Sequence, residues 1–271
     1  MKTTNNLGTK VIINADDFGY SHEVNQSILE AIGKAVISST TIMANAPAVQ
    51  EALQIAGRNP QISYGVHLNL TEFQPLSLDA DLKSTGLVDA SGNFLGNGFR
   101  QLRPTPNLLQ ACYEELVLQL QSLLATGLKP SHLDSHHHVH TIPWLLPVIT
   151  SLQRRFKLFK LRNTMNVYDL DSSHLPPKKL LAAKQIWQFS TRLMGSKLTE
   201  KFTSLHIFLS DPFRAEFTAA SSIELMCHPG QAGFEQETKD LLSMTEPILP
   251  NGFRLVNYRQ MHNDPNLRIN G

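Results

Sequence analysis

Short apolar runs alternate with amphipathic stretches along most of the chain. Residues 11–15 form an apolar run that predicts a buried strand, and Ser21 is placed to cap the helix that follows it. A β-branched run at 36–43 predicts a second strand, and residues 62–70 alternate apolar and polar side chains with the period of a strand. The same patterns predict helices after Pro47 through Ala56, at 109–123 with an end near Gly127, at 143–156 and at 180–194, and strands at 158–161 and 223–228.

This alternation of strands and helices predicts an α/β fold with mostly parallel strands and right-handed crossovers. About seven such units favour a barrel or a distorted barrel over an open doubly wound sheet. The chemistry of a barrel lies at the carboxyl ends of its strands, so polar residues at strand ends are the first candidates for a site. No glycine-rich phosphate loop follows a strand, and nothing therefore favours a nucleotide site.

The length of 271 residues fits one large α/β domain over 1–271. Residues 74–107 interrupt the pattern, because they are rich in Pro, Gly, Asp and Asn and show no helical period. We expect an insertion there, with a small hairpin around residues 90–93. Long insertions of this kind often shape the pocket of an α/β enzyme.

Composition excludes several classes of partner. The 24 Lys and Arg residues against 23 Asp and Glu residues give a net charge of +1, so no basic excess points to nucleic acid. No apolar run approaches the roughly 20 residues that a membrane helix needs. Residues 1–10 lack the apolar segment of a signal peptide, and two cysteines cannot make a disulfide framework. We expect a cytoplasmic protein without a membrane partner. The sequence does not decide between a monomer and a homodimer.

Two acidic residues follow the first predicted strand. Asp16 and Asp17 would repel each other at this position unless a cation or a shared proton relieves the contact. The alternative is an acidic pair that caps a helix or solvates a loop. His67 lies on the polar face of the strand at 62–70, where a single histidine is often a hydrogen-bonded core residue.

A stronger signal lies at residues 134–140, where four of the eleven histidines fall within five positions. In an extended chain Asp134, His136 and His138 share one face, and a His-x-His pair on one strand can converge on a metal. The alternative is an exposed polar loop. Imidazole and carboxylate without cysteine suit Zn²⁺, Co²⁺ or Ni²⁺, whereas harder ions need more oxygen ligands or water.

His228 ends the predicted strand at 223–228 and stands before Pro229 and Gly230. A histidine at a strand end is placed for proton transfer, and the alternative is a structural histidine beside a turn. Cys227 points to the opposite face of the strand, so we expect a small buried hydrophobic side chain there rather than a nucleophile.

Four ordered motifs together resemble the YdjC-like family of carbohydrate deacetylases, which are relatives of the chitooligosaccharide deacetylases and the hopanoid-associated deacetylase-like proteins. They are residues 14–21 (NADDFGYS), 65–71 (GVHLNLT), 132–140 (HLDSHHHVH) and 226–230 (MCHPG). The resemblance spans most of the chain. It is absent from a divergent helical segment at about 165–220. At Phe73 relatives commonly carry glycine, so the loop on the substrate side departs from the family.

The resemblance implies a distorted (β/α) TIM-like barrel of the glycoside hydrolase/deacetylase type with one divalent metal ion. Asp17, His67 and His136 match the family's ligands, with His138 as the reserve ligand. The implied ion is Zn²⁺ or Mg²⁺, with Co²⁺ and Ni²⁺ as further options. Three protein ligands leave room for water, as open metal sites require.

The resemblance also implies the roles of three further residues. Asp16 matches the general base, His228 the acid, and Arg162 the active-site arginine, which we expect to bind substrate unless it is a solvated surface residue. The implied reaction is hydrolysis of an N-acetyl group on a sugar. The alternatives are a metal-dependent phosphoesterase and a metal-binding regulatory protein without turnover, and acetate release separates the first from the other two.

Overall fold

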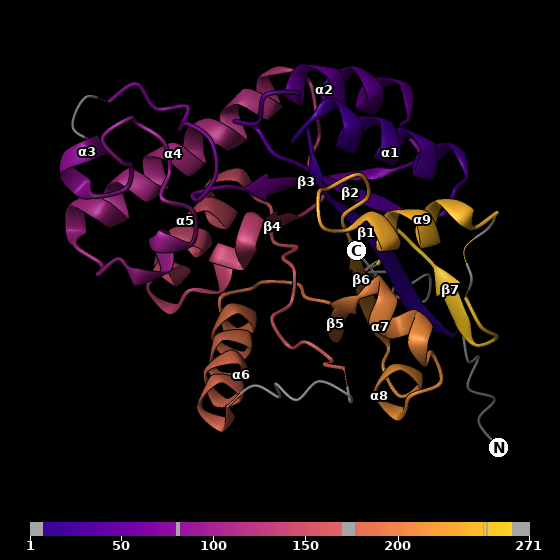
Figure 1. Ribbon diagram of the computed structural model, residues 1–271. Helices are drawn as coiled ribbons and strands as arrows, with labels where there is room; N and C mark the ends of the chain where they lie inside the picture. The colour runs from indigo at the N-terminus through magenta and orange to yellow at the C-terminus, as the bar shows by residue number, and fades with distance from the viewer. Residues whose placement is uncertain (1–7, 80–81, 170–176, 246, 248, 262–271) are drawn as a thin grey trace, which may run out of the picture.

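A curled sheet of parallel strands forms the centre of the molecule (Figure 1). The computed structural model describes residues 8–79, 82–169, 177–245, 247 and 249–261. The strand order is β4-β3-β2-β1-β6-β5, with β7 paired to the start of β1, and every pair is parallel. This confirms the α/β fold with a distorted TIM-like barrel. The strands are β1 (Thr9–Phe18), β2 (Ser39–Ile42), β3 (Ser63–Leu68), β4 (Leu133–Ser135), β5 (Lys201–Ser204), β6 (Ser222–Cys227) and β7 (Phe253–Leu255).

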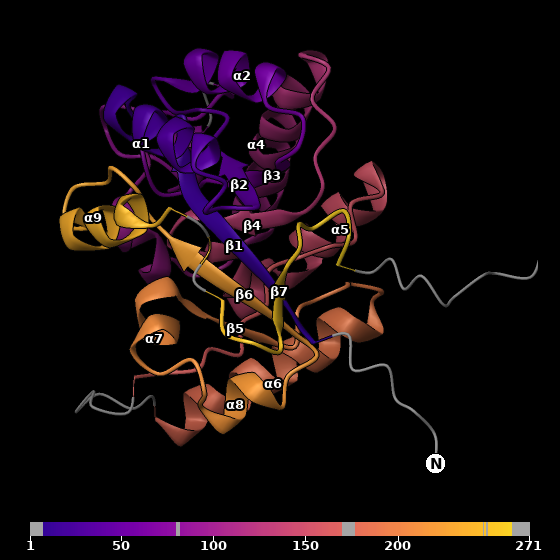
Figure 2. The same cartoon turned by 90° about the vertical axis from the view of Figure 1, so that its right-hand side faces the viewer.

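Helices surround the curled sheet, as two perpendicular views show (Figures 1 and 2). The predicted cap is confirmed, because Ser21 Oγ accepts a hydrogen bond from the backbone N–H of Val24 at 3.2 Å. No helix within the described ranges is long and apolar enough to cross a membrane. The helices are α1 (His22–Gly33), α2 (Val49–Arg58), α3 (Leu82–Thr85), α4 (Pro106–Ala125), α5 (Leu146–Phe156), α6 (Lys178–Leu193), α7 (Leu205–Ser210), α8 (Ala215–Thr218) and α9 (Glu235–Ser243), with short 3₁₀ turns η1 (Gly96–Gln101), η2 (His136–Thr141) and η3 (Pro143–Leu145).

The core lies between the sheet and these helices. Apart from Lys10, every residue of β1 is buried, as expected for a parallel strand whose two faces are both covered. The apolar face of α4 packs onto this core, and the free cysteines Cys112 on α4 and Cys227 on β6 are both buried in it. Cys227 is therefore a core residue, as the sequence predicts.

Some strand predictions are wrong in extent. The run at 36–43 yields only the four residues of β2. Residues 158–161 form isolated parallel bridges, Leu133 with Leu161 and Lys160 with Lys197, in place of a continuous strand. The pattern does not predict β5 and β7, because strands of four and three residues are too short to show a period.

The two irregular segments contain more structure than their composition suggests. The insertion at 74–107, apart from residues 80–81, which lie outside the described residues, includes α3 and η1. Its predicted hairpin is confirmed by an antiparallel bridge between Val88 and Phe94. Residues 170–176 of the divergent segment at 165–220 also lie outside the described residues. The rest includes three helices and β5, so this segment contributes to the sheet as well.

Candidate metal and catalytic centre

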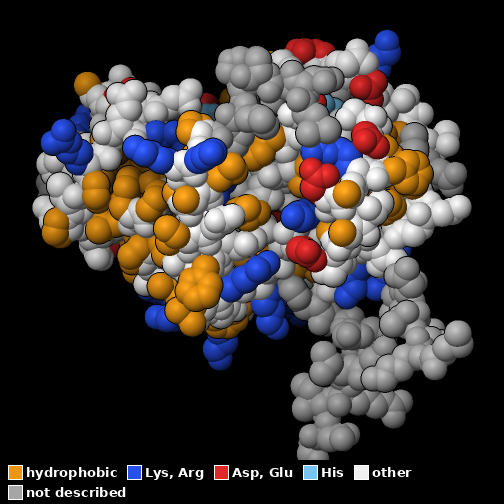
Figure 3. Space-filling view, turned by 90° about the horizontal axis from the view of Figure 1, so that it is seen from below, with side chains coloured by type: hydrophobic (Ala, Val, Ile, Leu, Met, Phe, Trp, Pro, Cys, Tyr) orange, Lys and Arg blue, Asp and Glu red, His pale blue; other side chains and the backbone are white. Residues whose placement is uncertain are grey.

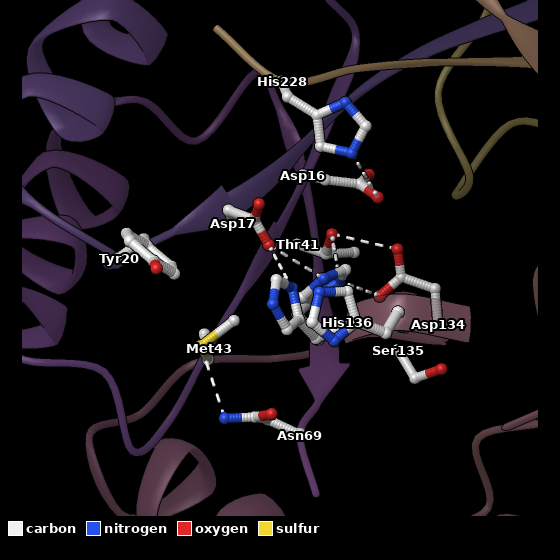
Figure 4. Close-up of polar contacts among 12 residues, drawn as sticks. Asp16, Asp17, Tyr20, Thr41, Met43, Asn69, Asp134, Ser135, His136 and His228 are labelled. Carbon is white, nitrogen blue, oxygen red and sulfur yellow. Dashed lines mark hydrogen bonds and ion pairs between the residues drawn. The ribbon is translucent and has the colours of Figure 1, made fainter. Parts of the chain in front are cut away.

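Asp16 and Asp17 lie at the end of β1, and both contact the same centre (Figure 4). Adjacent residues of a regular strand point to opposite faces. Here the pairing of β1 with β2 shifts by one residue between Ala15 and Phe18, and Asp17 has a φ of 65°. Bulges of this kind redirect side chains beside active sites. As a result both carboxylates, each 2% exposed, take part in one buried polar centre.

One carboxylate oxygen of Asp17 meets two imidazole rings. His67 on β3 places Nε2 3.1 Å from Asp17 Oδ1, and His136, directly after β4, places Nδ1 2.8 Å from the same oxygen. The ligand atoms of the three residues all lie within 4.8 Å of one another. We call Asp17, His67 and His136 the metal-ligand cluster.

The contact of the other ring nitrogen of His67, Nδ1, indicates that the cluster can hold a cation. His67 Nδ1 lies 2.8 Å from Asp134 Oδ1, so a neutral ring that donates its single N–H there turns an unprotonated Nε2 toward the Asp17 carboxylate. That contact needs a positive charge, supplied by a second proton or by a metal ion. Burial lowers the pKa of His67, but Asp134 and the other nearby carboxylates raise it to about 10. A carboxylate behind a metal-ligating histidine is typical, so the donor set fits a divalent ion.

The chain turns at His136 where an extended strand was predicted. β4 ends one residue earlier, and the two residues after His136 have positive φ values of 49° and 52°. The prediction that Asp134, His136 and His138 share one face of a strand is therefore wrong, because left-handed residues break the two-residue period. The ring centroids of His138 and Phe202 are 5.7 Å apart, so the His138 ring packs against Phe202. Among the described residues, His138 belongs to no group whose ligand atoms converge on a possible metal position.

Arg162 is surrounded by carboxylates. Its Nη1 and Nη2 each lie 2.6 Å from an oxygen of Asp16, its Nε lies 2.8 Å from Glu224 Oε1, and its Nη2 lies 3.0 Å from Asp134 Oδ2. We call these four residues the arginine cluster. Arg162 is 0% exposed, so the alternative of a solvated surface residue is wrong. Its guanidinium faces protein carboxylates, and substrate binding by Arg162 stays a prediction.

The arginine cluster fixes the charge of Asp16. Burial alone would raise the pKa of Asp16, but the Arg162 guanidinium holds that pKa well below its ordinary value. Asp16 Oδ1 also accepts a hydrogen bond from Asn14 Nδ2 at 2.8 Å. Asp16 is therefore an ionised, firmly positioned carboxylate at neutral pH.

His228 approaches the same carboxylate from the end of β6. Its Nε2 lies 4.0 Å from Asp16 Oδ2, and its Nδ1 lies 3.6 Å from Glu237 Oε1 on α9. The same Glu237 oxygen accepts a hydrogen bond from the His228 backbone N–H at 2.5 Å. Burial lowers the pKa of His228, but Glu237 and Asp16 together raise it above its ordinary value. His228, whose side chain is 16% exposed, thus holds a proton more firmly than an ordinary histidine and keeps access to the centre.

Several residues of the centre were not predicted from the sequence. Thr41 on β2 donates a hydrogen bond to Asp134 Oδ2 at 3.0 Å, and the Tyr258 hydroxyl donates to Glu224 Oε2 at 2.5 Å. The sequence could have indicated Glu224, because an acidic residue inside an apolar strand needs a buried partner. Nothing in the sequence indicated Thr41 or Tyr258, since threonine is common in strands and tyrosine in cores.

Known proteins identify the family. The YdjC-like protein family matches residues 10–258. A carbohydrate deacetylase from Geobacillus stearothermophilus is 33% identical over 93% of this chain and 97% of the relative, and a chitooligosaccharide deacetylase from Salmonella paratyphi B is 34% identical over 81% of each. A crystal structure from Enterococcus faecalis, named as a candidate cellobiose-phosphate cleavage protein, matches with a TM-score of 0.69 and 26% identity over 94% of this chain and 99% of that one. These matches confirm the resemblance carried by the four motifs, and the chain belongs to the YdjC-like family.

Proposed function

We propose that the protein is a metal-dependent carbohydrate deacetylase, which hydrolyses the N-acetyl group of an acetylated sugar or oligosaccharide. Similarity over nearly the full length of the Geobacillus stearothermophilus carbohydrate deacetylase supports this substrate class. The observation that carries the proposal is the convergence of His67 and His136 on Asp17, directly beside an ionised Asp16. Amide hydrolysis needs a water that loses a proton and an amine that gains one, and this centre offers a group for each task.

Asp17, His67 and His136 would hold one divalent ion. Two imidazoles and one carboxylate suit Zn²⁺, and also Co²⁺ or Ni²⁺, whereas Mg²⁺ would need further oxygen ligands from water. When bound, the ion lowers the pKa of water and polarises the acetyl carbonyl. Asp134 supports this arrangement, because its contact with His67 Nδ1 orients the ring and its tautomer.

Asp16 would accept the proton of the attacking water. The two hydrogen bonds from Arg162 keep Asp16 ionised and fix both of its oxygens. The same ion pair reduces the basicity of Asp16, so Arg162 contributes position and charge state rather than basicity.

His228 would donate a proton to the departing amine. An amine leaves a tetrahedral intermediate poorly unless it is protonated, so the acid must carry its proton while Asp16 is ionised. The opposite pKa shifts of Asp16 and His228 favour this combination of an ionised base and a protonated acid.

A second candidate is a metal-dependent phosphoesterase. The Enterococcus faecalis structure, which shares the fold at 26% identity, is named for cleavage of cellobiose phosphate, a sugar that carries a phosphate ester, and the name does not say which bond is cleaved. A similar metal site can hydrolyse a phosphate ester, since the ion also polarises a phosphoryl oxygen. A regulatory protein that binds metal without turnover is the third reading.

The products of hydrolysis separate these functions. We would strip the protein with a chelator, reload it with Zn²⁺, Mg²⁺, Co²⁺ or Ni²⁺, and measure acetate from N-acetylglucosamine oligomers and phosphate from sugar phosphates. The deacetylase should release acetate only after reloading. Phosphate release without acetate would support the phosphoesterase, and stoichiometric metal binding without either product would support the regulatory protein.

A further inference from the structure

Phe73 has a backbone conformation that bulky residues rarely adopt. Its φ is 64°, in the left-handed region that glycine enters without strain. The loop is held on both sides: Asn69 Oδ1 accepts hydrogen bonds from the backbone N–H groups of Thr71 and Glu72, and the Phe73 carbonyl accepts one from the Phe94 N–H at 2.9 Å. A strained residue that its surroundings hold in place beside a candidate active site indicates a use for its side chain.

The Phe73 ring adjoins the metal-ligand cluster through Tyr20. The ring centroids of Phe73 and Tyr20 are 4.9 Å apart, and the Tyr20 ring is 6.2 Å from the His136 ring. In the view of Figure 4, Tyr20 and Asp134 lie on opposite sides of Asp17. Phe73 and Tyr20 are both only partly buried, so each ring keeps an accessible surface. We call these two residues the aromatic wall.

The molecule has space for a ligand beside this wall. A cavity of about 440 Å³ is lined by Tyr20, Gly230, Gln231 and Ala232, among others. Its volume falls within the ~300–1,000 Å³ of small-molecule sites. Tyr20 is the member of the aromatic wall that lines this cavity, so the cavity lies on the Tyr20 side of the wall.

We propose that the aromatic wall binds a sugar ring of the substrate and that Phe73 is a specificity-determining residue. A pyranose presents a face of C–H groups that packs well on aromatic rings, while its hydroxyl groups need polar partners. Glu72 is such a partner at the edge of the wall, where its carboxylate accepts a hydrogen bond from the Tyr20 hydroxyl at 3.4 Å. The inference rests on the proposed deacetylase function and adds the contact that favours a ring-shaped carbohydrate over a small acyclic amide.

The Phe73→Gly variant separates this role from a packing role, because it removes the ring and the backbone strain together. We expect a Tm that is unchanged or higher. The KM for the N-acetylglucosamine disaccharide should rise roughly 3-fold to 10-fold, the worth of one aromatic contact. The kcat should change little, since the wall binds ground state and transition state alike. The conservative variant Phe73→Tyr keeps an aromatic ring, so its KM should stay much closer to the wild-type value than the KM of Phe73→Gly.

Lys157 provides a matched control for the strain. It is an exposed residue at the C-terminal end of α5 and has a φ of 55°. Lys157→Gly relieves the same kind of strain outside the wall, so its Tm should rise while its KM stays that of the wild type.

An unchanged KM in Phe73→Gly together with a lower Tm would make Phe73 a packing residue and overturn the proposal. If the wild type releases no acetate, calorimetric titration of the Zn²⁺-loaded proteins with the same disaccharide tests the wall separately. The Kd should then be higher for Phe73→Gly by the same factor as expected for the KM. Equal Kd values, or no binding to either protein, would contradict a sugar-binding wall.

Discussion

The metal-ligand cluster and the arginine cluster adjoin each other, yet they balance negative charge in different ways. In the arginine cluster the positive charge belongs to the chain, since Arg162 holds both oxygens of Asp16 at 2.6 Å. In the metal-ligand cluster Asp17 meets the nitrogens of His67 and His136, and the other nitrogen of His67 already contacts a carboxylate. The arginine cluster therefore contains a permanent positive charge of its own, whereas the metal-ligand cluster requires an added proton or a bound cation.

This difference fits the different roles that we propose for the two consecutive aspartates. Asp16 faces a permanent charge and stays ionised in a fixed position, as a proton acceptor requires. Asp17 faces an exchangeable charge, as a metal ligand requires. The bulge at the end of β1 and the positive φ of Asp17 direct the two carboxylates to these separate partners.

Removing a ring of the metal-ligand cluster should have the largest effect on turnover. We expect His67→Ala and His136→Ala to lose the bound divalent ion and to fall to background acetate release, because two remaining ligands hold a metal poorly. Metal analysis of the purified proteins checks this result. His22→Ala, at an exposed histidine on α1, is the matched control and should keep metal and turnover. Full metal content in both cluster variants would exclude this site.

Removing the charge of the arginine cluster should instead reduce stability. Arg162→Met leaves three buried carboxylates without their partner, which should cost about 3–5 kcal/mol in the free energy of unfolding. Chemical denaturation measures this loss. The folded fraction should still bind one metal ion, since Arg162 is no ligand. Loss of metal with wild-type stability would show that the two clusters are not separate units.

The effect of His228 should depend on the leaving group. His228→Ala should keep its metal and lose about 100-fold or more of its turnover on an N-acetyl sugar, the usual contribution of a general acid. An activated ester, whose leaving group needs no proton, should be hydrolysed with a much smaller loss. Equal losses on both substrates would assign His228 to substrate positioning.

The smallest expected effect is a displacement of the pH profile. Because Glu237 and Asp16 raise the pKa of His228, its proton is present below that raised value and is lost as the pH increases through it. Turnover should therefore fall on the alkaline side. Glu237→Gln removes one of the raising charges and should move this falling limb to lower pH. A limb that stays in place would mean that another group controls it.

Much of the fold was predictable because long strands and helices produce a periodic spacing of apolar residues in the sequence. The buried face of α4 and the alternation along β3 are examples. The edges of the sheet were not predictable. The three residues of β7 carry too little pattern to be predicted. The strand predicted at 158–161 marks the right segment, but its reduction to single bridges depends on contacts with Leu133 and Lys197 that no local sequence encodes.

The candidate site was predictable where residues follow strands. Asp16, Asp17 and His67 are at or near the strand ends where the sequence suggested chemistry. The histidine-rich stretch contributes His136 to the polar centre, but its conformation was not predicted, because left-handed φ values at two consecutive histidines have no sequence signal. The ion pairs of Arg162 were also not predicted, since its three carboxylate partners come from β1, β4 and β6.

The division of roles between the two aspartates is tested most directly by measuring metal content and acetate release for Asp16→Asn and Asp17→Asn side by side. Asp16→Asn should retain one metal ion per chain and lose about 100-fold to 10,000-fold in turnover, because an amide keeps the shape but accepts no proton. Asp17→Asn should lose the metal and the activity together. A full site in Asp17→Asn with an empty site in Asp16→Asn would reverse the two assignments and contradict the distinction between the clusters.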